Sequence, residues 1–154
     1  MKINYIKGDA TNPVGNDPKI ICHICNDIGA WGAGFVMALS KRWKEPERDY
    51  RQWFKKQSNF YLGQVQFVPV ENNLVVCNMI AQSGTISEDN PAPIRYGALQ
   101  VCLQKVAKEA KKTNASIVGP KFGSGLSGGS WPHIEQIIND ELCFKDIPVT
   151  IYSL

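Results

Sequence analysis

The stretch that decides the fold is residues 20–34, which read IICHICNDIGAWGAG. Its first half is an apolar run typical of a buried strand, and Gly29, Gly32 and Gly34 follow. Glycine allows a tight turn and leaves peptide N–H groups open to a ligand. Residues 34–43 then carry apolar side chains at helical spacing. The stretch therefore predicts a strand, a glycine-bearing loop and a helix whose N-terminus can bind an anion.

A second stretch, residues 116–127, repeats this arrangement. A short strand at residues 116–120 leads to GSGLS at residues 123–127, and Ser130 is placed to cap the following helix. In open α/β sheets, ligands bind in the crevice beyond the carboxyl ends of the strands. Two glycine-bearing loops at that crevice predict a site that contacts a diphosphate from both sides.

The rest of the chain alternates between strand and helix patterns. In chain order, these patterns predict a strand at residues 3–7, helices at residues 34–43 and 46–54, a hairpin of residues 65–68 and 74–80 around Asn72-Asn73, an exposed loop at residues 82–93 beside the crevice, a helix carrying Leu99, Leu103, Val106 and Ala110, and strands at residues 116–120 and 149–154. This order predicts an α/β fold with a mixed sheet between helices. Periodicity alone does not give the strand order.

Composition limits the class of protein. With 154 residues and 44% apolar side chains, the chain is expected to form a single domain, residues 1–154. The net charge is only +3 and the basic residues are dispersed, so we expect no dedicated nucleic-acid surface. No apolar run approaches the length of a membrane span, so we expect no membrane contact and a cytoplasmic location.

The five cysteines lie mostly in apolar stretches and are expected to be buried free thiols. Cys22 and Cys25 form a C-x-x-C motif, but they lie within a predicted strand, where residues three apart point to opposite faces. A zinc site would need a second pair of ligands, which the sequence lacks. We therefore expect neither a metal nor a cofactor.

Four motifs, taken in order, resemble those of the macrodomain family. They are Lys7-Gly8-Asp9-Ala10, then His23-Ile24-Cys25-Asn26 with Trp31-Gly32-Ala33-Gly34, then Gly123-Ser124-Gly125-Leu126, and finally Ile151-Tyr152-Ser153-Leu154. The resemblance covers almost the whole chain. It implies one macrodomain over residues 1–154, a three-layer α/β/α sandwich with a mixed central sheet, and binding of ADP-ribose or a derivative, with an ADP-ribosylated macromolecule as the alternative ligand.

The resemblance also implies a set of binding residues. Asp9 would accept a hydrogen bond from the adenine amino group beside Ala10, although it can also shape a turn. Tyr152 would lie near the adenine, or be an ordinary strand tyrosine; Trp31 would cover the ligand or pack over its loop. The two loops would contact the diphosphate or serve only as tight connections. The loop and strand-end residues in this set are Cys25, Gly32, Ala33, Gly34, Gly123, Ser124, Gly125, Leu126 and Ser127.

Within macrodomains, the chain resembles the branch of the yeast ADP-ribose 1″-phosphate phosphatase and the human terminal ADP-ribose glutamate hydrolase. The phosphatase resemblance makes His23 the nucleophile or general acid–base, with Asn26 holding substrate oxygens; the alternative for His23 is a satisfied core residue. The human-type hydrolases use a lysine and an aspartate where this chain has Gln82 and Ser127. Because neither can supply an amine nucleophile or a carboxylate base, we expect no lysine-dependent chemistry.

Three functions remain open at this point. The first is a phosphatase acting on ADP-ribose 1″-phosphate. The second is a non-catalytic ADP-ribose reader. The third is a hydrolase of ADP-ribosyl groups or O-acyl-ADP-ribose that works without the lysine. We rank the phosphatase first and the reader second.

Overall fold

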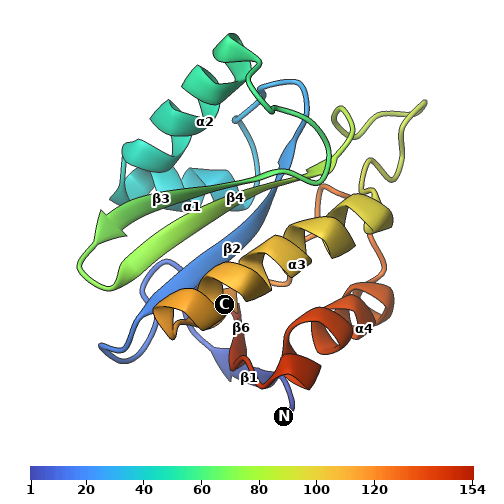
Figure 1. Ribbon diagram of the computed structural model, residues 1–154. Helices are drawn as coiled ribbons and strands as arrows, with labels where there is room; N and C mark the ends of the chain where they lie inside the picture. The colour runs from blue at the N-terminus through green and yellow to red at the C-terminus, as the bar shows by residue number, and fades with distance from the viewer.

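The computed structural model describes residues 1–154 and has a six-stranded central sheet with the order β1-β6-β5-β2-β4-β3 (Figure 1). The strands are β1 (Asn4–Lys7), β2 (Lys19–Asn26), β3 (Val65–Glu71), β4 (Leu74–Gln82), β5 (Ser116–Gly119) and β6 (Val149–Ser153). All neighbouring pairs are parallel except β3 and β4, which form the antiparallel hairpin. The predicted mixed sheet is confirmed.

Helices cover both faces of the sheet (Figure 1). They are α1 (Phe35–Arg42), α2 (Glu45–Lys56), α3 (Tyr96–Thr113) and α4 (Trp131–Glu141), with a short 3-10 helix η1 (Cys143–Lys145). The α1–α2 pair packs on one face and the α3–α4 pair on the other, and each pair buries its own hydrophobic cluster. This arrangement is the predicted three-layer α/β/α sandwich.

The central strand β2 supplies both clusters because successive side chains alternate between faces. Ile20 and Cys22 pack with α3 and α4, whereas Ile21 and Cys25 pack with α1 and α2. Cys22 and Cys25 therefore lie on opposite faces, and all five cysteines are buried free thiols, as predicted. Burial on both faces is typical of a parallel central strand.

One local prediction, the Ser130 cap, is right in its position and wrong in its side-chain hydrogen bond. Ser130 occupies the N-cap position of α4, but its side chain makes no capping hydrogen bond. Its backbone N–H instead donates to the hydroxyl of Tyr96, 2.9 Å away, and Pro132 stands in the first turn, where a missing N–H costs little. No helix in the structure is long and apolar enough to span a bilayer.

Candidate functional site

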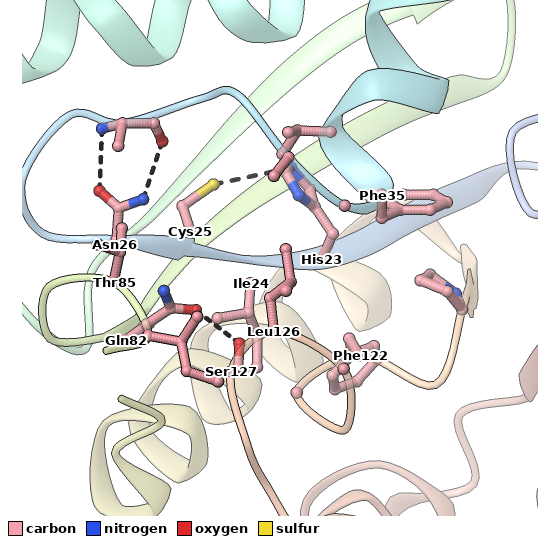
Figure 2. Close-up of a pocket in the computed structure, with 18 of the residues that line it drawn as sticks. His23, Ile24, Cys25, Asn26, Phe35, Gln82, Thr85, Phe122, Leu126 and Ser127 are labelled. Carbon is pink, nitrogen blue, oxygen red and sulfur yellow. Dashed lines mark hydrogen bonds between the residues drawn. The ribbon is translucent and has the colours of Figure 1, made fainter. Parts of the chain in front are cut away.

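The main cleft, of about 620 Å³, opens beyond the carboxyl ends of β2 and β5 (Figure 2). Its walls are the first loop and the start of α1, residues 30–36, and the second loop, residues 120–127. Residues 23–26 of β2 lie between them, and Gln82, Thr85 and Ile86 complete the lining. The two glycine-bearing stretches therefore meet at one site, as the sequence predicted.

Most of the predicted site residues line this cleft. They are His23, Cys25, Asn26, Trp31, Gly32, Ala33, Gly34, Gly123, Ser124, Gly125, Leu126 and Ser127. The sequence analysis missed the apolar part of the lining, which includes Ile24, Phe35, Val36 and Phe122. The signal for Phe35 and Phe122 was their position directly beside the glycines.

Asp9, Ala10 and Tyr152 lie outside the cleft lining. Oδ1 of Asp9 accepts hydrogen bonds from the hydroxyl and the backbone N–H of Thr11, and these bonds hold the pKa of Asp9 below its usual value. Tyr152 is only 5% exposed, and its hydroxyl accepts a hydrogen bond from the N–H of Val14. Asp9 therefore shapes a turn and Tyr152 packs in the core, and their contacts with adenine stay predictions.

Asn26 organises the first loop. Its Oδ1 accepts hydrogen bonds from the N–H groups of Ile28 and Ala30. Its Nδ2 donates to the carbonyl of Ala30, and Figure 2 draws both bonds between Asn26 and Ala30. The buried hydroxyl of Tyr50 donates to Asn26 as well, 2.6 Å from its carbonyl oxygen. Because most of its amide is used in this way, Asn26 holds the loop that forms one wall of the cleft.

Peptide N–H groups on both walls are free of protein partners. In the first loop, those of Gly32, Ala33 and Gly34 find no acceptor in the protein, and in the second loop neither do those of residues 125–127. The backbone of Gly34 has a φ of 85°, in the region that favours glycine. The second loop reaches across to it, since a Cβ at Gly34 would lie 3.3 Å from Leu126. Both walls of the cleft therefore carry peptide N–H groups that have no acceptor in the protein.

Lys121 is the only lining residue with a permanently charged side chain, and two aromatic rings lie near its ammonium group. Its ammonium lies 5.9 Å from the ring centroids of both Tyr5 and Trp131. This is the geometry of a cation–π contact. Donors to an anion in the cleft are therefore mainly peptide groups.

His23 lies in the cleft wall but is closed to solvent. The residue is 2% exposed, and the rings of Trp31 and Phe35 pack against it at centroid distances of 5.5 and 6.0 Å. Its Nε2 lies 2.5 Å from Oδ1 of Asn78, whereas its Nδ1 has no hydrogen-bond partner. Burial lowers the pKa of His23 to about 4, so the ring is neutral at pH 7.

Trp31 packs under the first loop. Its indole N–H donates to the hydroxyl of Ser40, and its ring lies 5.4 Å from that of Tyr50. The residue is 5% exposed. The structure therefore shows Trp31 packed within the protein at the cleft wall, and its contact with a ligand stays a prediction.

Gln82 and Ser127 meet on the opposite side of the cleft (Figure 2). The Ser127 hydroxyl donates to Oε1 of Gln82 over 2.6 Å, and Nε2 of Gln82 donates to the carbonyl of Gly84 over 2.9 Å. Both side chains are buried and neutral. The two positions that the resemblance paired are thus in contact, and neither carries an amine or a carboxylate.

The loop after β4, predicted to lie beside the crevice, forms part of its rim. Thr85 and Ile86 line the cleft. The side chain of Asn90 donates to the carbonyls of Ser83 and Thr85, and Asp27 accepts from the N–H of Gly84. The Asn90 bonds hold the loop together, and the Asp27 bond joins it to the residue that follows β2.

Similar solved structures identify the class. The chain is an α/β/α sandwich with a cleft between two glycine-bearing loops, and a macrodomain protein from Streptomyces coelicolor shares this fold with 44% identity, a TM-score of 0.89 and 99% coverage of both chains. A Bacteroides thetaiotaomicron protein of unknown function is 55% identical, with a TM-score of 0.97 over 100% of this chain and 99% of that one. No protein-family model matches the sequence. The chain belongs to the macrodomain family.

Curated relatives fall into two groups. Chromodomain-helicase-DNA-binding protein 1-like from Mus musculus is 31% identical over 163 residues, which cover 97% of this chain but 17% of that protein. This chain therefore spans about a sixth of that relative. The ADP-ribose 1″-phosphate phosphatase of Saccharomyces cerevisiae is 25% identical over 177 residues and is matched along 98% of its length, with 99% of this chain covered.

Proposed function

We propose that this macrodomain binds ADP-ribose or a derivative in the cleft and removes the terminal phosphate of ADP-ribose 1″-phosphate. The observation that carries the proposal is the set of free peptide N–H groups on both walls, at residues 32–34 and 125–127. A diphosphate presents acceptor oxygens on both sides, and hydrogen bonds to a charged acceptor are the stronger kind. The N-terminus of α1 adds the favourable end of its dipole.

The phosphatase step is supported by the yeast relative, which is matched over nearly its whole length, and by the state of His23. A neutral ring keeps a lone pair on one of its two nitrogens at pH 7, and Nδ1 is the nitrogen without a protein partner. In the proposed reaction, Nδ1 takes a proton from the water that attacks phosphorus. The bond from phosphorus to the ribose oxygen breaks, and that oxygen takes a proton from solvent. A phosphate dianion beside the ring raises the pKa of His23 and makes it a better base.

His23 becomes accessible in this scheme only when a covering side chain moves. Phe35, at the start of α1, packs against the ring. In this scheme, Phe35 is the side chain that rotates to uncover Nδ1, because it also lines the cleft. Substrate binding between the loops would supply the free energy for this movement.

Binding is tested by calorimetric titration with ADP-ribose, using two matched variants. A Cβ added at Gly125 or at Gly97 meets no atom within 4 Å, so Gly125→Glu and Gly97→Glu should both fold. Only Gly125 lies in the cleft. We expect Gly125→Glu to weaken binding at least about tenfold, roughly 1.4 kcal/mol, and Gly97→Glu to bind as the wild type does. A wild-type protein that does not bind ADP-ribose refutes the whole proposal.

Catalysis is tested by phosphate release from ADP-ribose 1″-phosphate. We expect His23→Ala to lower kcat by about a hundredfold or more, the usual contribution of a general base, while ADP-ribose still binds. Wild-type protein that binds ADP-ribose but releases no phosphate is a reader instead. The burial of His23 favours this second candidate function, the non-catalytic reader. Release of free ADP-ribose from an ADP-ribosylated macromolecule or an O-acyl ester would instead identify the third candidate, a hydrolase.

A further inference from the structure

A row of three polar side chains crosses the sheet behind the cleft. His23 on β2 is directly opposite Asn78 on β4, and Asn78 is directly opposite Gln66 on β3. The row faces α2, whose backbone carbonyls at Pro46 and Asp49 approach it. Asn78 is completely buried. A buried polar row is costly unless every member is paired, so the direction of each hydrogen bond is constrained.

The directions follow from the two carbonyls, which can only accept. Nε2 of Gln66 donates to the carbonyl of Asp49 over 3.0 Å, so the amide oxygen of Gln66 faces Asn78. Nδ2 of Asn78 donates to that oxygen over 3.0 Å and to the carbonyl of Pro46 over 3.2 Å. Oδ1 of Asn78 must therefore face His23. Reversing either amide would place an N–H or a carbonyl against a group of its own kind.

The tautomer of His23 is thereby determined. An acceptor 2.5 Å from Nε2 requires a proton on Nε2, and in a neutral ring Nδ1 is then unprotonated. The thiol of Cys25 lies 3.8 Å from Nε2, but it does not compete, because the Asn78 oxygen is much closer and is a stronger partner. The atom left without a protein partner is Nδ1.

We propose that Asn78 and Gln66 are positioning residues that hold His23 in the Nε2–H tautomer and so leave Nδ1 as the acceptor for a ligand in the cleft. This inference rests on the proposed function for its catalytic meaning only. The tautomer itself is a property of the free protein. Neither Asn78 nor Gln66 is part of the cleft lining, and Asn78 contacts the lining residue His23, so their effect on a bound ligand passes through His23.

The first test is ¹⁵N NMR of the histidine rings in the free protein at pH 7. His133→Gln removes the second histidine, so the remaining signals belong to His23. We expect a proton on Nε2 and a bare Nδ1. A proton on Nδ1 overturns the inference, whatever the enzyme assay shows. Nε2–H together with an absence of phosphate release leaves the inference standing and refutes the phosphatase proposal alone.

The second test uses two substitutions at the half-buried Gln66. Gln66→Leu removes one acceptor of Asn78, whose orientation then depends on Pro46 alone. We expect a measurable fraction of the Nδ1–H tautomer and a fall in kcat of about three- to tenfold with KM unchanged, the effect of one neutral hydrogen bond. Gln66→Glu keeps the acceptor for Asn78 but loses the donor to the Asp49 carbonyl, so it should bring the tautomer ratio and kcat closer to the wild-type values than Gln66→Leu does. Equal tautomer ratios in wild type and Gln66→Leu would refute the role of Gln66, and an unchanged kcat despite a changed ratio would refute positioning.

Discussion

Acid should destabilise this protein through His23. The folded-state pKa of this residue is about 4 because burial disfavours the charged ring, whereas the ordinary value is 6.5. In the unfolded chain, the His23 ring therefore binds a proton as pH falls through 6.5. In the folded protein, the same ring stays neutral until pH approaches 4. Stability that is present above pH 6.5 is lost over this window.

The size of the loss follows from the two pKa values. A pKa of 6.5 in the unfolded chain and of about 4 in the folded protein means that the proton affinity of His23 differs by a factor of roughly 300 between the two states. This difference lowers the free energy of unfolding by about 3 kcal/mol at pH 4 or below. At pH 5 the loss is about 2 kcal/mol, because the unfolded ring is then almost fully protonated and the folded ring is not. With a urea m-value of roughly 2 kcal/mol/M, the unfolding midpoint should fall by about 1 M between pH 7.5 and pH 5.

The matched variant is His23→Gln in a His133→Gln background, which leaves no histidine in one protein and His23 alone in the other. Urea unfolding of both at pH 7.5, 6 and 5 gives the difference in their pH dependence, in which any packing change at pH 7.5 cancels. Carboxyl groups such as Asp9, with a pKa held below 3.8 by Thr11, titrate at lower pH. Equal slopes in the two proteins would show that His23 is not buried as a neutral ring, and the reasoning would fail.

Two further substitutions test how the cleft walls are held. Ser127→Ala leaves the buried Oε1 of Gln82 without its donor, so urea titrations should show a free energy of unfolding lower by about 1–3 kcal/mol. The control is Ser124→Ala, at an exposed hydroxyl, which should change that free energy by less than about 0.5 kcal/mol. Equal losses in the two variants would contradict the contact between Ser127 and Gln82. Gly29→Ala places a Cβ 2.4 Å from the ring of Phe54 at a φ of 75°, so thermal unfolding should show a loss of roughly 2 kcal/mol or more, and an unchanged melting temperature would mean that the loop is not built around Phe54.

Local sequence signals predicted the elements and the two loops well. The apolar run at residues 20–25 and the glycines that follow two strands are local properties, so the cleft walls were visible in the sequence. Ser130 lies at the predicted N-cap position, but its side chain makes no capping bond, and its backbone N–H donates to the hydroxyl of Tyr96. Helix ends depend on neighbours that the local sequence does not contain.

Contacts between strands could not be predicted in the same way. His23 and Asn78 are 55 residues apart, and their pairing requires β2 to lie beside β4, which periodicity does not reveal. The resemblance named Gln82 and Ser127 together, but their contact is visible only in the structure, since nothing in either segment indicates the other. The polar atoms that most define the chemistry of this site are therefore the ones that needed the strand order.

Recognition by peptide groups changes which residues matter for binding. Because Lys121 is engaged by Tyr5 and Trp131, a ligand diphosphate would depend on the positions of loop N–H groups rather than on a side-chain charge. Those positions are set from below by Asn26 and Tyr50, whose hydrogen bonds hold the first loop on the sheet. A side chain can therefore control affinity here without touching the ligand, because it fixes the backbone that does.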